Sequence, residues 1–182
     1  MARIAVAPDD RPDWIVRAVE EGGAEVVPLE RAEALVWTSH RRAGELADRV
    51  AGAPWLRWVQ LPWAGVEEFA GAGLFGLQGD GPRTWTCGKG VYAEPVAEHA
   101  LALVLAGLRG LPARALATSW GAQWGRTLYG GRVTILGAGG IADSLIRLLE
   151  PLRVEVTVVR RGAEPVPGAA RTLPADRLHQ AL

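Results

Sequence analysis

The sequence predicts an α/β protein built from mostly parallel sheets with helices on their faces. Three observations support this fold class. Short apolar runs typical of buried strands alternate with segments of helical periodicity over residues 1–90. A strand–turn–helix–strand pattern begins again near residue 132. The 182 residues, of which 49% are hydrophobic and 22% charged, are enough for one ordinary domain or two small ones.

We expect residues 1–90 to form the first domain. Apolar side chains at Trp14, Ile15 and Ala18 lie on one face of a helix, and the glycine pair that follows is typical of a helix end. The glycine-rich segment 71–81 predicts a loop. The expected strands are 3–7, 25–29, 34–38, 56–61 and 84–86, and the expected helices are 13–21 and 44–50.

We expect residues 91–182 to contain linker helices and the first part of a second domain. Residues Pro95–Arg109 carry the strongest helix signal, because proline is favourable in a first turn and Ala and Leu are strong helix formers. A helix over about 112–120 follows it. The remaining expected elements are a strand at 133–136, a helix at 141–149, a strand at 154–159, a loop from 162 and a helix beginning at 175.

The composition argues against several classes of function. Formal net charge is zero, so no electrostatic footprint for nucleic acid is expected. A single cysteine, Cys87, excludes an internal disulfide framework and a cysteine-based metal cluster. The N-terminus lacks the apolar core of a signal peptide, and the longest apolar run, 100–108, is too short for a membrane span. We therefore expect a cytoplasmic protein without a metal, nucleic-acid or membrane partner.

The segment 137–142 has the pattern G-x-G-x-x-A between a strand and a helix. Gly137 allows a tight turn after the strand, and Gly139 lets the backbone approach a pyrophosphate closely. Ala142 permits close packing of helix on strand, and the helix N-terminus offers unpaired N–H groups to an anion. The pattern predicts a dinucleotide-binding turn, with an ordinary glycine-rich turn as the alternative.

The end of the following strand indicates which dinucleotide would bind. An Asp or Glu there accepts hydrogen bonds from the 2′-hydroxyl of NAD, whereas an arginine accommodates the 2′-phosphate of NADP. This sequence has Arg160 and Arg161 at that place. Because a guanidinium can bind a phosphate through two hydrogen bonds, we predict a preference for NADP(H) over NAD(H). The alternative interpretation is that both arginines mark a solvated strand end.

Three stretches in their order resemble the D-isomer-specific 2-hydroxyacid dehydrogenases: "LRWVQLPWAGVEEF", "GVYAEPVAEHALALVLAGLR" and "GGRVTILGAGGIA". The resemblance implies a flavodoxin-like substrate domain and a Rossmann nucleotide domain. It implies hydride transfer between a nicotinamide cofactor and a small 2-keto or 2-hydroxy acid, as in glyoxylate/hydroxypyruvate reductases and phosphoglycerate dehydrogenases. Members of the family are commonly dimers joined through the nucleotide domain and linker helices, so a homodimer is expected.

The resemblance also assigns roles to individual positions. Backbone N–H groups of the loop 63–66 would bind the substrate carboxylate, with a plain strand-to-helix turn as the alternative. Val91 would touch the nicotinamide end of the cofactor. Many members have an arginine where this chain has Gly140, which removes one cationic contact with the cofactor. Trp37, near the end of the expected strand 34–38, is a further substrate candidate, although an aromatic side chain there is more often part of a core. His40, which follows this strand, is a weaker candidate. The predicted cofactor-binding residues are Gly137, Ala138, Gly139, Gly140, Ile141, Arg160, Arg161 and Val91, and the predicted substrate-binding residues are Trp63, Ala64, Gly65, Val66 and Trp37.

The family's reaction depends on an arginine and a His–Glu pair that no position of these 182 residues matches. None of His40, His99 and His179 lies at the motif position, so no catalytic residue is assigned. We expect the chain to be the N-terminal part of a dehydrogenase, and expect the 182 residues alone to be inactive. The alternatives are a non-catalytic dinucleotide-binding module and a degenerate fragment.

Overall fold

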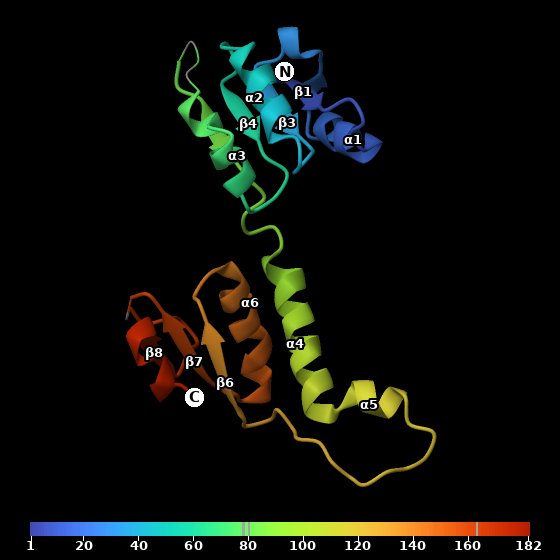
Figure 1. Cartoon of the computed structure of the whole chain (residues 1–182), viewed down its shortest axis with the longest axis vertical. Helices are drawn as coiled ribbons and strands as arrows, with labels where there is room; N and C mark the ends of the chain where they lie inside the picture. Colours follow the sequence, from blue (N-terminus) through green and yellow to red (C-terminus); the bar gives the residue numbers. More distant parts are fainter. Residues whose placement is uncertain (78, 80, 163) are drawn as a thin grey trace. The chain divides into compact units, whose positions relative to one another are not determined.

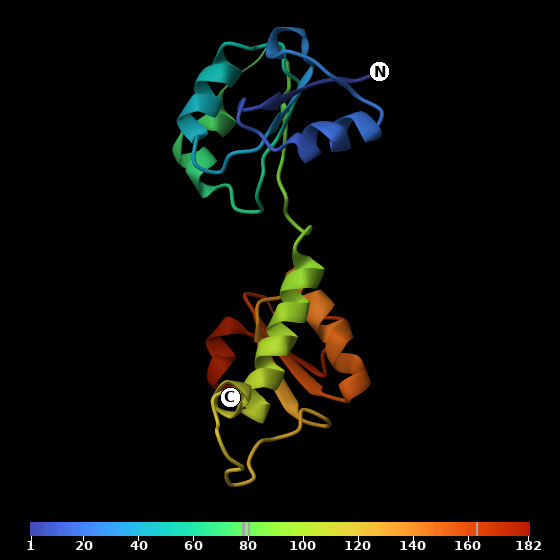
Figure 2. The same cartoon turned by 90° about the vertical axis from the view of Figure 1, so that its right-hand side faces the viewer.

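The computed structural model describes residues 1–77, 79, 81–162 and 164–182. The chain divides into two compact units, an N-terminal unit from Met1 to Lys89 and a C-terminal unit from Gly90 to Leu182. Figure 1 and Figure 2 show each unit as a sheet with helices beside it. No helix in the described ranges is both long and apolar enough to cross a membrane.

The N-terminal unit is built on one parallel sheet of five strands in the order β2-β1-β3-β4-β5. This is the flavodoxin-like order of doubly wound folds, and it confirms the predicted fold class for this unit. In both views α1 lies on one side of the sheet, and α2 and α3 lie on the other. The elements are β1 (Arg3–Ala7), α1 (Asp13–Glu21), β2 (Glu25–Val26), β3 (Ala34–Trp37), α2 (Ala43–Ala51), β4 (Trp58–Gln60), α3 (Glu67–Gly71) and β5 (Thr84–Thr86).

Several elements of this unit differ from the expectation. The strand expected over 56–61 covers only Trp58–Gln60, and α3 is not among the expected helices. The strand expected over 25–29 ends at Val26, because Pro28 and a short 3-10 turn at Leu29–Arg31 turn the chain away from the sheet. The expected loop 71–81 contains the end of α3 and a 3-10 turn at Leu74–Gly76, since the Leu74 side chain is fully buried and fixes this segment. Gln78 and Asp80 of that loop lie outside the described residues.

The C-terminal unit has a parallel three-stranded sheet in the order β6-β7-β8. Helices α4 and α6 pack on each other, and their apolar side chains share one core with β6 and β7. Because the strands are parallel, the ends of β6, β7 and β8 meet at the same edge of the sheet. The elements are α4 (Ala93–Arg109), α5 (Leu111–Ala115), β6 (Arg132–Leu136), α6 (Gly140–Leu149), β7 (Glu155–Arg160) and β8 (Arg171–Pro174).

In the C-terminal unit, three segments differ from the expectation. The helix expected over 112–120 is only five residues long and ends at Ala115. Strand β8 lies within a segment that the sequence did not identify as a strand. The helix expected from residue 175 is a 3-10 segment, η4 (Ala175–Gln180), with a kink at Arg177. This segment contacts β7 and β8, so it partly covers the sheet near their ends.

Candidate functional site

The glycine-rich turn joins the end of β6 to the start of α6. Gly137 has a φ angle of 103°, which an L side chain rarely adopts, and its N–H donates to the carbonyl of Val159 at 2.8 Å. Gly139 has an extended backbone and occupies the N-cap position of α6. Among the described residues no side chain caps this helix, whose first intrahelical bond runs from Asp143 N–H to the Gly139 carbonyl. The turn therefore presents a free helix N-terminus.

The space around the turn suits a pyrophosphate. A Cβ atom added at Gly137 or at Gly139 would meet no atom within 4 Å, so the backbone is open to a ligand on this side. A Cβ atom at Gly140 would lie 3.4 Å from the Ala93 side chain, which places the first turn of α4 beside the turn. Val91 is two residues before Ala93 and is 72% exposed. The C-terminal unit thus brings the start of α4 close to the predicted cofactor residues.

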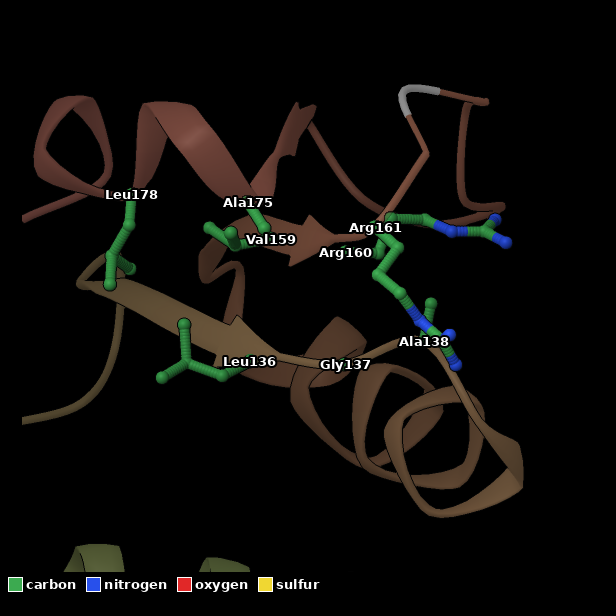
Figure 3. Close-up of a pocket in the computed structure, with 8 residues that line it drawn as sticks. All are labelled: Leu136, Gly137, Ala138, Val159, Arg160, Arg161, Ala175 and Leu178. Carbon is green, nitrogen blue, oxygen red and sulfur yellow. The ribbon is translucent and has the colours of Figure 1, made fainter.

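A pocket of about 470 Å³ opens beside the turn, at the edge where β6 and β7 end. Figure 3 shows Leu178 at one end of this pocket and the side chains of Arg160 and Arg161 at the other, on the side of Ala138. The pocket therefore has an apolar end and a cationic end. Its lining residues are Leu136, Gly137, Ala138, Val159, Arg160, Arg161, Ala175 and Leu178.

Sequence reasoning missed the part of this pocket that η4 supplies. Ala175 and Leu178 belong to a segment that the sequence identified only as the beginning of a helix. Sequence reasoning also missed Glu164, whose Oε2 lies 3.8 Å from Nη2 of Arg160. An acidic residue four positions after a strand-end arginine was a visible signal, although the sequence alone does not show that the loop returns to the strand end.

The predicted substrate loop, residues 63–66, follows β4 in the N-terminal unit. Trp63, Ala64 and Gly65 are exposed, and the carbonyl of Trp63 accepts a hydrogen bond from Gly88 N–H at 3.0 Å. The ring of Trp63 meets His40 edge to face, with centroids 5.7 Å apart. His40 Nε2 in turn accepts a hydrogen bond from Arg41 Nε at 3.1 Å. The structure therefore brings the weaker candidate His40 to this loop.

Glu67 folds back over the same loop. A Cβ atom at Gly65 would lie 2.7 Å from the Oε2 atom of Glu67, so the carboxylate occupies the space that a side chain at position 65 would need. Only glycine leaves room for this arrangement. A substrate carboxylate that approached the loop here would meet the negative charge of Glu67.

Trp37 lies in a different place from the other substrate candidates. Its side chain is 0% exposed and packs in the core of the N-terminal unit with Leu35 and Leu46. The guanidinium of Arg49 lies 6.0 Å from its ring centroid, and the indole Nε1 has no partner among the described residues. A substrate role for Trp37 stays a prediction that this buried position does not support.

The remaining titratable candidates do not form a catalytic group in the described residues. His99 on α4 and His179 in η4 are both exposed, and no hydrogen bond to either side chain is present there. Cys87 is a free, half-buried thiol, and Lys89 is exposed at the boundary between the units. No group of three or more potential metal ligands occurs in the described part of the chain.

Comparisons with known proteins found one curated relative in sequence and several solved structures of similar fold. No protein-family model matches the sequence. One curated relative, described as an uncharacterized protein in the proB 3′ region of Corynebacterium melassecola, is 31% identical over 131 residues. The match spans 67% of this chain and 41% of the relative's length.

Three similar solved structures are dehydrogenases or reductases. A D-isomer-specific 2-hydroxyacid dehydrogenase family protein from Aeromonas salmonicida matches with a TM-score of 0.75 and 18% identity, over 98% of this chain and 60% of its own. A D-isomer-specific 2-hydroxyacid dehydrogenase from Xanthobacter autotrophicus, in complex with NADPH and MES, matches with a TM-score of 0.75 and 16% identity, over 100% and 60%.

An NADPH-dependent glyoxylate/hydroxypyruvate reductase from Sinorhizobium meliloti, in complex with NADP and sulfate, matches with a TM-score of 0.71 and 20% identity, over 100% of this chain and 59% of its own. The chain spans about 60% of the length of each of these proteins. Over the part that it spans, the chain has the fold of the D-isomer-specific 2-hydroxyacid dehydrogenases.

Proposed function

We propose that this chain belongs to the D-isomer-specific 2-hydroxyacid dehydrogenases and binds NADP(H) in preference to NAD(H). The observation that carries the proposal is the pocket beside the glycine-rich turn, which has Arg160 and Arg161 at one end. Open space at Gly137 and Gly139 supports binding of a pyrophosphate at the turn. Two of the similar structures are complexes with NADPH or NADP, which supports the same class of cofactor.

Each part of the site has a distinct task in this proposal. The N–H groups at the start of α6 would bind the pyrophosphate, because no side chain in the described residues caps them. The apolar end of the pocket, at Leu136 and Leu178, would bury the adenine ring. Arg160 and Arg161 would bind the 2′-phosphate through charge-assisted hydrogen bonds. Val91, beside the start of α4, would border the nicotinamide end.

The proposed reaction interconverts a small 2-keto acid, such as glyoxylate or hydroxypyruvate, and a D-2-hydroxy acid. The nicotinamide supplies or accepts the hydride when the cofactor is bound. The backbone N–H groups of loop 63–66 would hold the substrate carboxylate, which requires the Glu67 carboxylate to move away from Gly65. This contact fixes the orientation of any 2-keto acid, since all of them carry that carboxylate, and so it does not select among them.

We also propose that the 182-residue polypeptide binds the dinucleotide without turning over substrate. A general acid for the carbonyl oxygen, most often a histidine, must be held near the substrate by a partner. His99 and His179 have no hydrogen-bonded carboxylate in the described residues, and His40 is bonded to Arg41. Glyoxylate-dependent oxidation of NADPH by the purified polypeptide would contradict this proposal. A cofactor-dependent change in oligomeric state without turnover would favour a non-catalytic binding module.

The cofactor preference is tested by titration calorimetry with NADPH and NADH. We expect the wild-type chain to bind NADPH at least tenfold more tightly. We expect Arg160→Ala and Arg161→Ala each to weaken NADPH binding about tenfold while NADH changes little, since a charge-assisted hydrogen bond contributes about 1.5–3 kcal/mol before solvent exposure reduces it. Arg171→Ala, at the opposite end of the sheet, is the matched control. Equal or tighter binding of NADH by the wild type would overturn the NADP preference.

We further propose a homodimer formed through the C-terminal unit. Large apolar side chains on α4, on α5 and on the segment after α5 are exposed, and Trp120 is 100% exposed. An exposed apolar surface of this kind is typical of an interaction site. The exposed residues are Leu103, Val104, Leu105, Leu111, Leu116, Trp120 and Trp124.

A further inference from the structure

Glu164 is the acidic residue that lies beside the arginine at the end of β7. Its Oε2 is 3.8 Å from Nη2 of Arg160, and the two side chains are 71% and 37% exposed. Arg160 lines the pocket beside the glycine-rich turn, so Glu164 brings a negative charge to the cationic end of that pocket.

Gly162 makes room for this carboxylate. A Cβ atom at position 162 would overlap the carboxylate of Glu164, so any larger residue there would displace the side chain. Gly162 has no positive φ angle that would itself require glycine. In this structure the absence of a side chain at 162 therefore allows Glu164 to lie over the backbone near Arg160.

The ion pair is weak enough for a phosphate to break. Exposed pairs of this kind contribute about 0.2–1 kcal/mol, and the 3.8 Å separation is long for a hydrogen-bonded pair. A 2′-phosphate that binds Arg160 would have to replace the carboxylate or remain close to a like charge. A 2′-hydroxyl carries no charge and meets no such repulsion.

We propose that Glu164 is a specificity-determining residue that lowers the preference of this chain for NADP(H) over NAD(H), by acting as the counterion of Arg160 in competition with the 2′-phosphate. The inference rests on the proposed dinucleotide function and refines it. The arginine pair sets the direction of the preference, and Glu164 limits its size.

Two variants test the role of Glu164 by different routes. Glu164→Gln removes the charge, and Gly162→Ala keeps the charge but displaces the carboxylate. We expect each to tighten NADPH binding about twofold to fivefold and to change NADH binding less than twofold, as the loss of a weak exposed counterion requires. We expect this gain in NADPH affinity to become smaller as the salt concentration rises, because the competing charges are exposed.

The control is Glu155→Gln, which removes the same charge at the beginning of the same strand, away from the pocket. Affinities are measured by titration calorimetry, and thermal unfolding monitored by circular dichroism verifies that each variant folds. The inference is overturned if NADPH affinity is unchanged in Glu164→Gln, or if NADPH and NADH tighten equally, as a general effect on a polyanion would produce. Wild-type protein that binds neither dinucleotide would instead overturn the proposed function, and this inference with it.

Discussion

Two single substitutions in the glycine-rich turn would separate its part in folding from the cofactor binding that we propose for it. Gly139 has φ −92° and ψ −176°, a conformation that alanine adopts without strain. Gly137 has φ 103°, which strains any L residue. Both positions have open space where a methyl group would point. Gly139→Ala should therefore weaken ligand binding without straining the backbone. Gly137→Ala should strain the backbone as well.

The magnitudes follow from these dihedral angles. Alanine at an N-cap is less favourable than glycine by about 0.5–1 kcal/mol, so Gly139→Ala should lower the melting temperature only slightly. Strain at a positive φ costs about 1–3 kcal/mol, which lowers the melting temperature of a unit of this size by roughly 4–8 °C per kcal/mol. The methyl group of Gly139→Ala would occupy the approach to the turn, and losing one charge-assisted N–H contact there weakens binding about tenfold or more.

The assay pairs thermal unfolding with titration of NADPH. Gly107→Ala in the interior of α4 is the control, because a Cβ atom there meets nothing within 4 Å and alanine is the better helix former. We expect this control to bind like the wild type and to unfold at an equal or slightly higher temperature. A Gly139→Ala variant that unfolds normally and binds NADPH within twofold of the wild type would refute the assignment of the turn.

Three further predictions concern the core, the glycine-rich turn and the exposed apolar surface of the C-terminal unit. Ile146→Ala removes a side chain that is 5% exposed in the core between α6 and the sheet, and should destabilise the unit by about 2–4 kcal/mol in denaturant unfolding. Gly140→Arg should tighten NADH and NADPH binding equally in calorimetry, since both share the pyrophosphate; a change confined to NADPH would contradict this. Trp120→Glu should convert the proposed dimer to a monomer in light scattering, and an unchanged mass would exclude this surface from the interface.

A local sequence pattern predicts a helix or strand well when the side chains of that segment determine its conformation. Strand β1 and helix α1 begin and end at the predicted residues, because the buried run of β1 and the apolar stripe of α1 are both visible in the sequence. Strand β8 shows the opposite case. Its four residues, Arg171–Pro174, include two polar side chains and a proline, and they form a strand because the edge of β7 is available for pairing. Such pairing is a tertiary effect that the local pattern does not contain.

The burial of the Trp37 side chain could have been predicted from the sequence. Alternate residues of a strand face the same side of a sheet, so Trp37 points in the same direction as Leu35. Both side chains are fully buried in the core that α2 covers. The end of a strand is a good predictor of where a ligand binds, but the alternation along the strand decides which side chains can reach it. His40, three residues later in the loop, contacts the predicted substrate loop instead.

The charges at the end of β7 are likewise only partly predictable from a local motif. Arg160 and Arg161 predict a phosphate site because strand ends meet the ribose in folds of this class. The free energy of that contact, however, depends on the other charges that the arginines face. Glu164 reaches Arg160 because its loop returns to the end of β7 and because Gly162 leaves the space open. The arginines at the strand end thus predict which cofactor is preferred, and we propose that the fold of the following loop determines by how much.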